Sequence, residues 1–420
     1  METTVKKLWN RNFTLLVAGQ LMSIFGNQIL TFALPLYVLQ THESPALFGT
    51  VLGLSFIPLI LTSPIGGIMA DRLRKQRVMF WLDVITTALI VLYMVVSNVF
   101  PAALVLIVTV KLLALNAIQG FYMPCVQGGL PFLVPQDRLT QANSATSAVN
   151  TLSSMAAPAL AGVLLGRFGL APILVAGAIC FAITAVMDLL IRFPYEKKHT
   201  DKGVLQIAKS DMAEALCFVK ARPLLIKIAV MMFIVSLLAS GILIVGVPVF
   251  ILRHLGMSME QMGIGRSISW SGALLGAAIV GYLGERLTIK SVPMSTILLG
   301  LSFIPIGLAL LLDIHYFAAF AIFIASDFIF TVIVLLYMLP MWAYMQRFTP
   351  EDLIGKVMSL FTALPFFASG VGFLVFGRLF ERFYSLSWLI VFITAFLMVI
   401  TALLLRKGFR ETKADADTGA

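Results

Sequence analysis

Long apolar segments recur along the whole chain, and each is long enough to cross a membrane as a helix. Of its 420 residues, 60% are hydrophobic and 12% charged, too few polar groups to cover a water-exposed surface. Lipid-facing apolar side chains remove that difficulty, and a helix satisfies its own backbone in lipid. The sequence therefore predicts an all-α membrane protein with twelve transmembrane helices, at 13–39, 46–70, 78–97, 101–123, 142–166, 171–191, 224–252, 260–283, 291–312, 315–345, 356–380 and 387–405.

The longest polar interval covers residues 192–222 and divides the predicted helices six and six. It includes an amphipathic stretch around Ile207–Val219. A polar interval between two apolar groups is typical of a linker between domains. We predict an N-terminal six-helix bundle at 1–191, a cytoplasmic linker at 192–222, and a C-terminal six-helix bundle with a short cytoplasmic tail at 223–420.

Basic residues predict the orientation of the chain. They gather near the N-terminus, after the second helix, in the central interval and in the tail. Lys and Arg favour the cytoplasmic side of a membrane. We therefore expect a protein of the bacterial cell membrane with both termini in the cytoplasm. The net charge of +10 is then a topology signal, and no nucleic-acid partner is expected. The three cysteines and four histidines lack metal-ligand spacing, so neither a metal nor a cofactor is predicted.

The two halves of the chain repeat. LPLYVLQ (34–40) aligns with VPVFILR (247–253), and GIMADRL (67–73) aligns with GYLGERL (281–287). These and later matches keep the same order and a nearly constant offset. Each copy holds an even number of helices, so the copies are parallel repeats that share one orientation.

The loop after the second helix reads GGIMADRLRKQR over 66–77, with a degenerate copy, GYLGERLTIK, at 281–290. This pattern resembles the signature of the major facilitator superfamily, and the resemblance covers essentially the whole chain. It implies the major facilitator fold, two parallel six-helix repeats. Contacts of this loop could latch the bundles in one conformation, or the loop could only fix topology. The latch candidates are Gly67, Asp71, Arg72, Lys75, Arg77, Glu285 and Arg286.

Two further stretches resemble parts of the same superfamily. AAPALAG (156–162) is similar to an incomplete copy of the superfamily's antiporter motif, in which Pro158 and Gly162 remain. An ordinary kinked helix with small packing residues would have the same sequence pattern. FYMPCVQGGLPFLVPQDRLTQANS (121–144) resembles the drug-exporting branch that includes macrolide efflux proteins and the enterobactin exporter. The second resemblance implies export.

Two charged residues lie near the middle of predicted membrane helices, Lys111 in the fourth and Asp327 in the tenth. Burying such a charge costs at least about 2.5–3.5 kcal/mol, so each is a functional candidate. The register that aligns Pro124 with Pro340 also aligns Lys111 with Asp327. The resemblance implies that these helices line a central cavity. We expect the two charges to couple transport to protons; a static pair or contact with substrate only are the alternatives.

Other polar residues are weaker candidates. Four could contact substrate or could instead bond a neighbouring helix: Asn27, Gln28, Asn116 and Gln119. Asp83 and Asp188 lie nearer the cytoplasmic ends of their helices. Basic side chains expected at that level could neutralise both, and they are Arg72, Arg77 and Arg192.

These features together predict a secondary active transporter, a functional monomer that exports amphipathic, drug-like or macrolide-like small molecules by proton antiport and alternating access. A siderophore or lysophospholipid transporter, or an uptake symporter, of the same fold is the alternative. A membrane receptor without transport is an alternative of a different class. We expect no enzyme, because the sequence lacks a nucleotide-binding loop, a metal-ligand cluster and a nucleophile–base arrangement.

Overall fold

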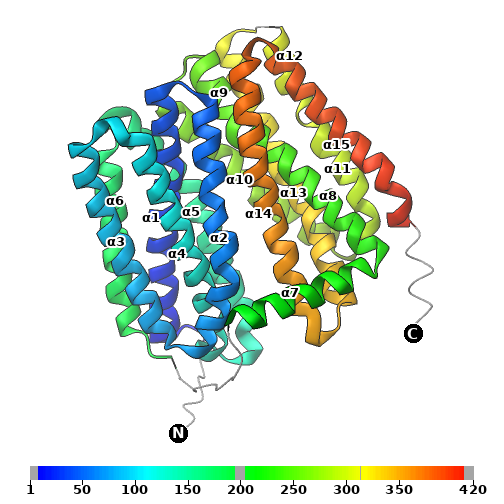
Figure 1. Ribbon diagram of the computed structural model, residues 1–420. Coiled ribbons are helices and arrows are strands. Elements are labelled where there is room, and N and C mark those ends of the chain that lie inside the picture. The colour runs from blue at the N-terminus through cyan, green and yellow to red at the C-terminus, as the bar shows by residue number, and fades with distance from the viewer. Residues whose placement is uncertain (1–7, 194–203, 313, 411–420) are drawn as a thin grey trace. The chain divides into compact units, whose positions relative to one another are not determined.

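The structure is a computed structural model that describes residues 8–193, 204–312 and 314–410 (Figure 1). Its N-terminal part contains the six long helices that the sequence predicts. Short 3-10 turns, η1 (Pro101–Ala103) and η2 (Gln136–Arg138), precede the fourth and fifth of them. The helices are α1 (Arg11–His42), α2 (Pro45–Arg72), α3 (Lys75–Val99), α4 (Leu104–Leu133), α5 (Leu139–Phe168) and α6 (Ala171–Leu190).

The C-terminal part contains the other six predicted segments; the short turns η5 (Gly284–Arg286) and η6 (Ile289–Ser291) lie between the second and third of them, and η7 (Tyr384–Leu386) lies between the last two. Eleven helical segments of the described residues are long and apolar enough to cross a membrane, and α10 completes the predicted twelve. The predicted all-α fold class is confirmed. The segments are α8 (Pro223–Ser240) with its continuation to His254, α10 (Met259–Leu283), α11 (Val292–Leu301) with α12 (Ile304–Leu311), α13 (Tyr316–Phe348), α14 (Glu351–Arg382) and α15 (Ser387–Arg410).

Prolines explain where the helices differ from the prediction. α4 runs through Pro124 and Pro131 to Leu133, well past the expected end at 123. Membrane helices tolerate such prolines because neighbouring groups satisfy the freed backbone carbonyls. The ninth predicted helix divides into α11 and α12, because Pro305 in the first turn of α12 has no N–H with which to continue the helix.

The seventh predicted helix departs from regular α-helical geometry in its second half. After α8, the π-helical segments η3 (Gly241–Gly246) and η4 (Phe250–His254) flank the short α9 (Val247–Val249), which holds Pro248. The glycines of η3 pack directly against the aromatic rings of Phe376 and Phe380 on α14, leaving little room for a Cβ atom. The widened turns therefore lie where a proline interrupts the hydrogen bonds and another helix approaches closely.

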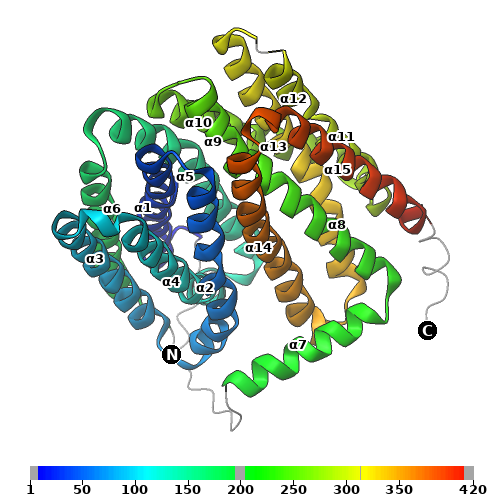
Figure 2. The same ribbon diagram turned by 45° about the horizontal axis from the view of Figure 1, so that its top comes forward.

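The predicted amphipathic stretch forms α7 (Val204–Lys220), the green helix labelled in Figure 2. Ala215, Phe218 and Val219 are buried on it. Glu214 pairs with Lys356 in the first turns of α14. The linker thus contains a helix that is tied to α14 by an ion pair.

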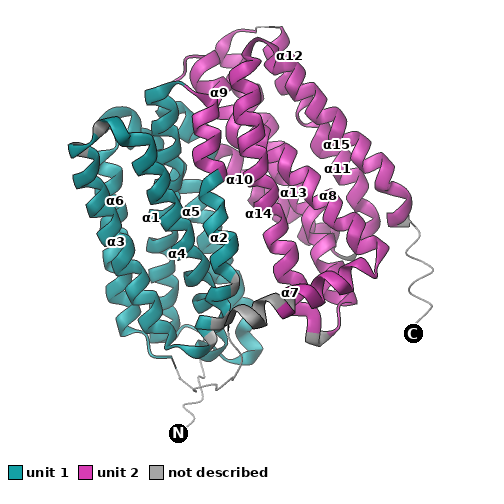
Figure 3. Ribbon diagram, in the orientation of Figure 1, with its two compact units in different colours: residues 1–43, 54–208, 258–267 teal, residues 44–53, 209–257, 268–420 magenta. Residues whose placement is uncertain are grey.

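The chain forms two compact units (Figure 3). Unit 1 comprises residues 1–43, 54–208 and 258–267, and unit 2 comprises residues 44–53, 209–257 and 268–420. Each half of the chain therefore gives the first turns of its second helix to the other unit: α2 begins in unit 2, and α10 begins in unit 1. Since α2 and α10 are equivalent in the sequence repeat, the exchange is reciprocal.

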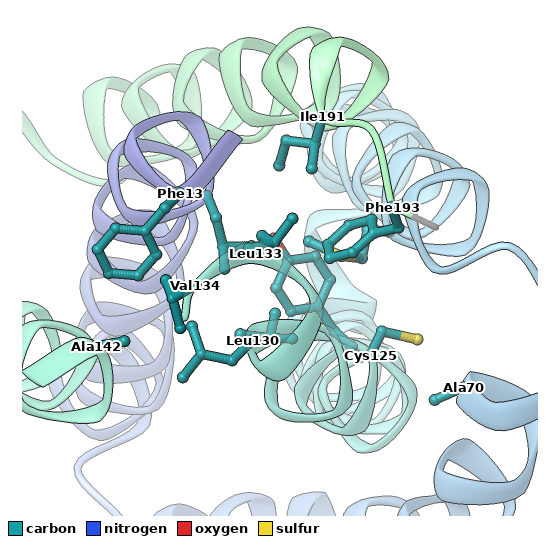
Figure 4. Close-up of a cluster of buried hydrophobic side chains, with 13 residues drawn as sticks. Phe13, Ala70, Cys125, Leu130, Leu133, Val134, Ala142, Ile191 and Phe193 are labelled. Atoms are coloured by element: carbon teal, nitrogen blue, oxygen red, sulfur yellow. The ribbon is translucent and has the colours of Figure 1, made fainter. Parts of the chain in front are cut away.

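Apolar packing closes one end of unit 1, where α1 begins and α4 ends (Figure 4). Asn10 caps α1 by accepting from the Phe13 N–H at 3.1 Å, and its side-chain amide donates to the Leu133 carbonyl at 2.7 Å. The buried cluster beside this cap fixes both helix ends. Its members are Phe13, Leu16, Ala70, Met79, Tyr122, Cys125, Val126, Leu130, Leu133, Val134, Ala142, Ile191 and Phe193.

In unit 2, α14 packs along α8, and α15 packs along both α11 and α12 (Figure 2). Phe303, Phe323 and Phe361 are among the largest fully buried side chains of this unit, and Phe303 stacks on Phe330 of α13 with ring centres 5.3 Å apart. Dispersion contacts between close-packed helices are the main stabilising interaction once the helices are in lipid.

Candidate functional site

Small residues line the crossing of α5 with the first turns of α10, inside unit 1. A Cβ atom on Gly162 would lie 2.5 Å from the carbonyl oxygen of Met259. A Cβ atom on Gly263 would overlap the carbonyl oxygen of Pro158 in the same way. The Ala159 N–H donates to the Ser267 hydroxyl at 3.0 Å, so the backbones are joined as well as close. Pro158 and Gly162 of the antiporter-like motif therefore lie at a tight helix crossing; their part in antiport stays a prediction.

An ion pair continues this crossing at the end of α5. The Arg167 guanidinium donates to both oxygens of Glu260 in α10, at 3.0 Å and 2.9 Å. Both side chains are substantially exposed, so the pair is open to solvent. The fork geometry makes the contact directional. It joins the last turn of one half's fifth helix to the first turn of the other half's second helix.

The equivalent crossing in unit 2 joins α2 to α14. Glu381 accepts from the Ser44 hydroxyl and from the Ala46 N–H, the latter at 2.8 Å. Further along α2, a Cβ atom on Gly53 would lie 2.8 Å from the carbonyl oxygen of Gly370. Glycines at the crossing and a polar contact at its end thus occur in both units, as the duplication predicts.

Replacing Glu381 with alanine is expected to destabilise the start of α2. The carboxylate caps a helix N-terminus, and losing such a cap costs about 1 kcal/mol. Thermal unfolding of the purified protein in detergent would measure this loss. Glu381→Gln keeps an acceptor oxygen and should lose less; equal melting temperatures for the wild type and Glu381→Ala would contradict the assignment.

The predicted latch loop follows α2. The close helix contact is at Gly66, which packs against the Gly120 backbone of α4, whereas a Cβ atom on Gly67 would meet no described atom within 4 Å. The Lys75 ammonium lies 5.3 Å from the centre of the Phe132 ring. Arg72 is half-buried, Arg77 and Arg286 are exposed, and the side chains of Asp71 and Glu285 are outside the described part of the structure. The latch itself stays a prediction.

Two of the predicted substrate residues line one small cavity in unit 1. Its volume is about 10 Å³, which is room for about one water molecule. A drug-sized ligand would need roughly 300–1,000 Å³. Contact with substrate therefore stays a prediction for Asn27 and Gln119. The cavity is lined by Ser23, Asn27, Asp83, Thr86, Leu115, Ile118, Gln119, Tyr122 and Phe181.

The other two predicted substrate residues have partners inside the bundle. The Gln28 amide donates to the Ser154 hydroxyl at 3.0 Å and so joins α1 to α5. The Asn116 amide donates to the Leu112 carbonyl of its own helix at 3.0 Å. These hydrogen bonds correspond to the packing alternative, and a role in substrate contact is for both residues a prediction only.

Lys111 and Asp327 are both buried, with 5% and 2% of their surfaces exposed. The Lys111 ammonium lies 4.3 Å from the centre of the Tyr93 ring on α3, and it has no hydrogen-bond partner among the described residues. A cation over an aromatic face is attracted by the ring. Lys111 belongs to unit 1 and Asp327 to unit 2, so their coupling stays a prediction.

Sequence reasoning missed one contact. Asp83 of α3 and Asp188 of α6 lie within hydrogen-bond reach of each other. The expected neutralisation by Arg72, Arg77 or Arg192 is not found, since none of these contacts either carboxyl group among the described residues. The depths of the two residues along their predicted helices were the only signal in the sequence. Among the described residues, no group of three or more His, Cys, Asp and Glu could hold a metal ion.

The many span-length helices, arranged in two compact units, define a polytopic all-α membrane protein. The chain matches the Major Facilitator Superfamily over residues 16–372, and it belongs to that family. Its relatives and structural neighbours are transporters and not enzymes.

Several relatives are similar over most of the chain. The uncharacterized MFS-type transporter YfiS of Bacillus subtilis is 27% identical over 364 residues, covering 85% of this chain and 84% of that protein. Macrolide efflux protein A of Streptococcus pyogenes is 22% identical, covering 91% and 93%. Multidrug efflux pump Tap of Mycolicibacterium fortuitum is 25% identical, covering 87% of both. A solved D-xylose–proton symporter has the same fold, with a TM-score of 0.71 at 12% identity over 95% and 97% of the chains.

Proposed function

We propose that this protein exports amphipathic small molecules from the cell in exchange for protons, by alternating access. The observation that carries the proposal is the similarity, over about nine-tenths of both chains, to macrolide efflux protein A (91% and 93%) and multidrug efflux pump Tap (87% of both). Macrolides and other drugs handled by such pumps are amphipathic. The apolar, Phe- and Met-rich helices suit them, because flexible Met and large aromatic side chains adapt to varied apolar shapes.

Alternating access is supported by the two reciprocal crossings. At each, glycine-rich helix surfaces meet, and a few polar contacts complete the junction. Small residues bury little side chain, so these surfaces can separate without leaving large apolar cavities. The latch loop would hold the alternative conformation, in which these surfaces have separated. Its candidate residues are Gly67, Asp71, Arg72, Lys75 and Arg77, with Glu285 and Arg286 in the second copy.

Proton exchange would use Asp327 and Lys111. A carboxylate is held ionised by a nearby ammonium and takes up a proton more readily when the ammonium moves away. A unit charge moved through 100 mV gains about 2.3 kcal/mol, so a modest change of surroundings is enough to couple the two movements. The protein would act as a monomer in the bacterial cell membrane with both termini in the cytoplasm.

Accumulation of a macrolide or a fluorescent dye by cells with and without the protein tests the proposal. Cells that make the protein should accumulate less, and the difference should vanish when an uncoupler collapses the proton gradient. The gradient supplies the free energy for export. A matched control is the same strain carrying the empty vector, with and without the uncoupler.

Two other outcomes would favour the alternatives. Higher accumulation in cells that make the protein would indicate uptake by a symporter of the same fold. No change across a broad panel of drugs, siderophores and lysophospholipids would contradict transport and favour a receptor.

A further inference from the structure

Two carboxyl groups meet in the interior of unit 1, Asp83 on α3 and Asp188 on α6. Each residue is only 1% exposed, and the two groups lie within hydrogen-bond reach of each other. α3 and α6 pack along each other for much of their length (Figure 1). We call these two residues the carboxyl pair. Both residues belong to unit 1.

The surroundings of the carboxyl pair are polar but supply no positive charge. From α1, Gly19 approaches Asp188, since a Cβ atom on it would lie 3.9 Å from Oδ1. From α4, the buried Tyr122 hydroxyl lies near both carboxyl groups, the Ser23 hydroxyl and the Cys125 thiol, and it has no hydrogen-bond partner among the described residues. Tyr122 and Cys125 are the titratable groups that face the pair. Among the described residues, no Lys or Arg forms an ion pair with it.

Two of the hydroxyl groups near the carboxyl pair donate to backbone carbonyls instead of to the carboxyl groups. The Thr86 hydroxyl donates to the Leu82 carbonyl at 2.8 Å, and the Thr184 hydroxyl donates to the Cys180 carbonyl at 2.9 Å. The Oδ2 atom of each aspartate is buried and has no hydrogen-bond partner among the described residues. A buried carboxylate oxygen without a donor is unfavourable.

A bound proton accounts both for the contact between the two carboxyl groups and for their buried oxygen atoms without a donor. Two carboxylates in contact repel each other, and both cannot be ionised in a low-dielectric interior. One shared proton makes the hydrogen bond between them and leaves a charge of −1. A second proton, on one of the unpartnered oxygens, makes the pair neutral; release of that proton restores the charge. No oxidant, reductant or metal takes part in this exchange.

The water-sized cavity adjoins the carboxyl pair. Asp83 and Tyr122 line it together with the uncharged Asn27 and Gln119. A water molecule there would have polar partners on several sides, which is the condition for a buried water to be stable. It could pass a proton to the carboxyl pair without either helix moving far. Two carboxyl groups are too few ligands for a structural metal ion, so a proton is the ligand that fits.

We infer that the Asp83–Asp188 carboxyl pair is a proton-binding site within the N-terminal bundle, separate from Asp327 and Lys111. The inference rests on the proposed function in one respect only: the protons that drive export would bind here as well as at Asp327. Binding itself is a property of the bundle, and it can be measured without any transported substrate.

Infrared spectroscopy of the full-length protein, reconstituted in vesicles of phosphatidylethanolamine and phosphatidylglycerol, tests the site with the proton as probe. Difference spectra between pH values should contain the carbonyl stretch of a buried, protonated carboxyl group, shifted in D₂O. Asp83→Asn and Asp188→Asn should each change this band, and the double variant should lose it. Asparagine has nearly the volume of aspartate, so the packing is retained.

Asp137→Asn is the matched control, because the Asp137 side chain is 77% exposed and outside the bundle. It removes one carboxyl group and should leave the buried band unchanged. If the asparagine variants do not fold, Asp188→Glu keeps a carboxyl group and should shift the same band. A band that survives the double variant, or one unmoved by Asp188→Glu, would overturn the inference. So would a band that depends on sodium at constant pH, since it would indicate a cation site.

A transport readout separates the two proposals. If export is driven by protons, Asp83→Asn and Asp188→Asn should lose the part of dye export that depends on the pH gradient, whereas Asp137→Asn should not. If the wild type exports without protons, the proposed antiport fails while the infrared band still decides the site. Full pH-driven export in the double variant, together with an unchanged band, would leave the carboxyl pair without a role in binding.

Discussion

Asp327→Asn is expected to abolish export driven by a pH gradient while the protein remains in the membrane at normal abundance. Asp327 is 2% exposed in the interior of α13, where an ionised carboxylate needs a nearby compensating group. Asparagine has almost the same shape but cannot release a proton, so binding can persist and coupling cannot. Dye export from vesicles with an imposed pH gradient measures the effect.

Asp327→Glu is the matched control, because it keeps the titratable group on the same helix and should retain part of the export. Lys111→Gln tests the partner. If the two charges act together, the double variant should lose little more than Asp327→Asn alone, because coupled residues are not additive. Undiminished pH-driven export by Asp327→Asn would remove Asp327 as the coupling residue.

Gly162→Ala is expected to impair both folding stability and export. The added methyl would lie 2.5 Å from the Met259 carbonyl oxygen, closer than atoms in contact allow, so α5 and α10 would have to move apart. Overpacking of this kind costs about 1–3 kcal/mol. A factor of ten in an equilibrium corresponds to about 1.4 kcal/mol, so the conformation that needs this crossing would lose about five- to 150-fold in population.

Gly166→Ala provides the control on the same helix, one turn further on. Its nearest neighbours would lie at 3.5 Å, which is ordinary contact, so no loss is expected. Thermal unfolding in detergent and dye export would be measured for both variants. Equal behaviour of the two would mean that the crossing is looser than the structure shows.

The positions of the helices could be predicted from sequence because the bilayer sets them. A segment must be about 20 residues long and apolar to cross, and this rule identifies α1 to α6 as well as α13 to α15. The errors are at prolines. Pro124 does not end α4, while Pro305 divides one predicted helix into two. Whether a proline ends a helix depends on what packs around it, which a single sequence does not contain.

The site could be predicted only in part, because most of these helices are apolar on nearly all sides. The sequence then gives the depth of a residue but not the direction in which its side chain points. From their depth, arginines at the same level could neutralise Asp83 and Asp188, but helix packing brings the two carboxyl groups together instead. Gly67 is one of the latch candidates, whereas the close contact with α4 is made by its neighbour Gly66. One residue along a helix is about 100° of rotation, enough to exchange such roles.

The π-helical turns beside Pro248 make the two copies of the duplicated unit mechanically unequal. Pro35, the equivalent residue in the first copy, lies in a continuous α-helix, whereas Pro248 lies between η3 and η4. A widened turn that tightens to α geometry advances the chain by one residue and rotates everything beyond it by about 100°. The first helix of the second half can therefore change its length and rotation at these widened turns, whereas the regular α1 of the first half has no such turn.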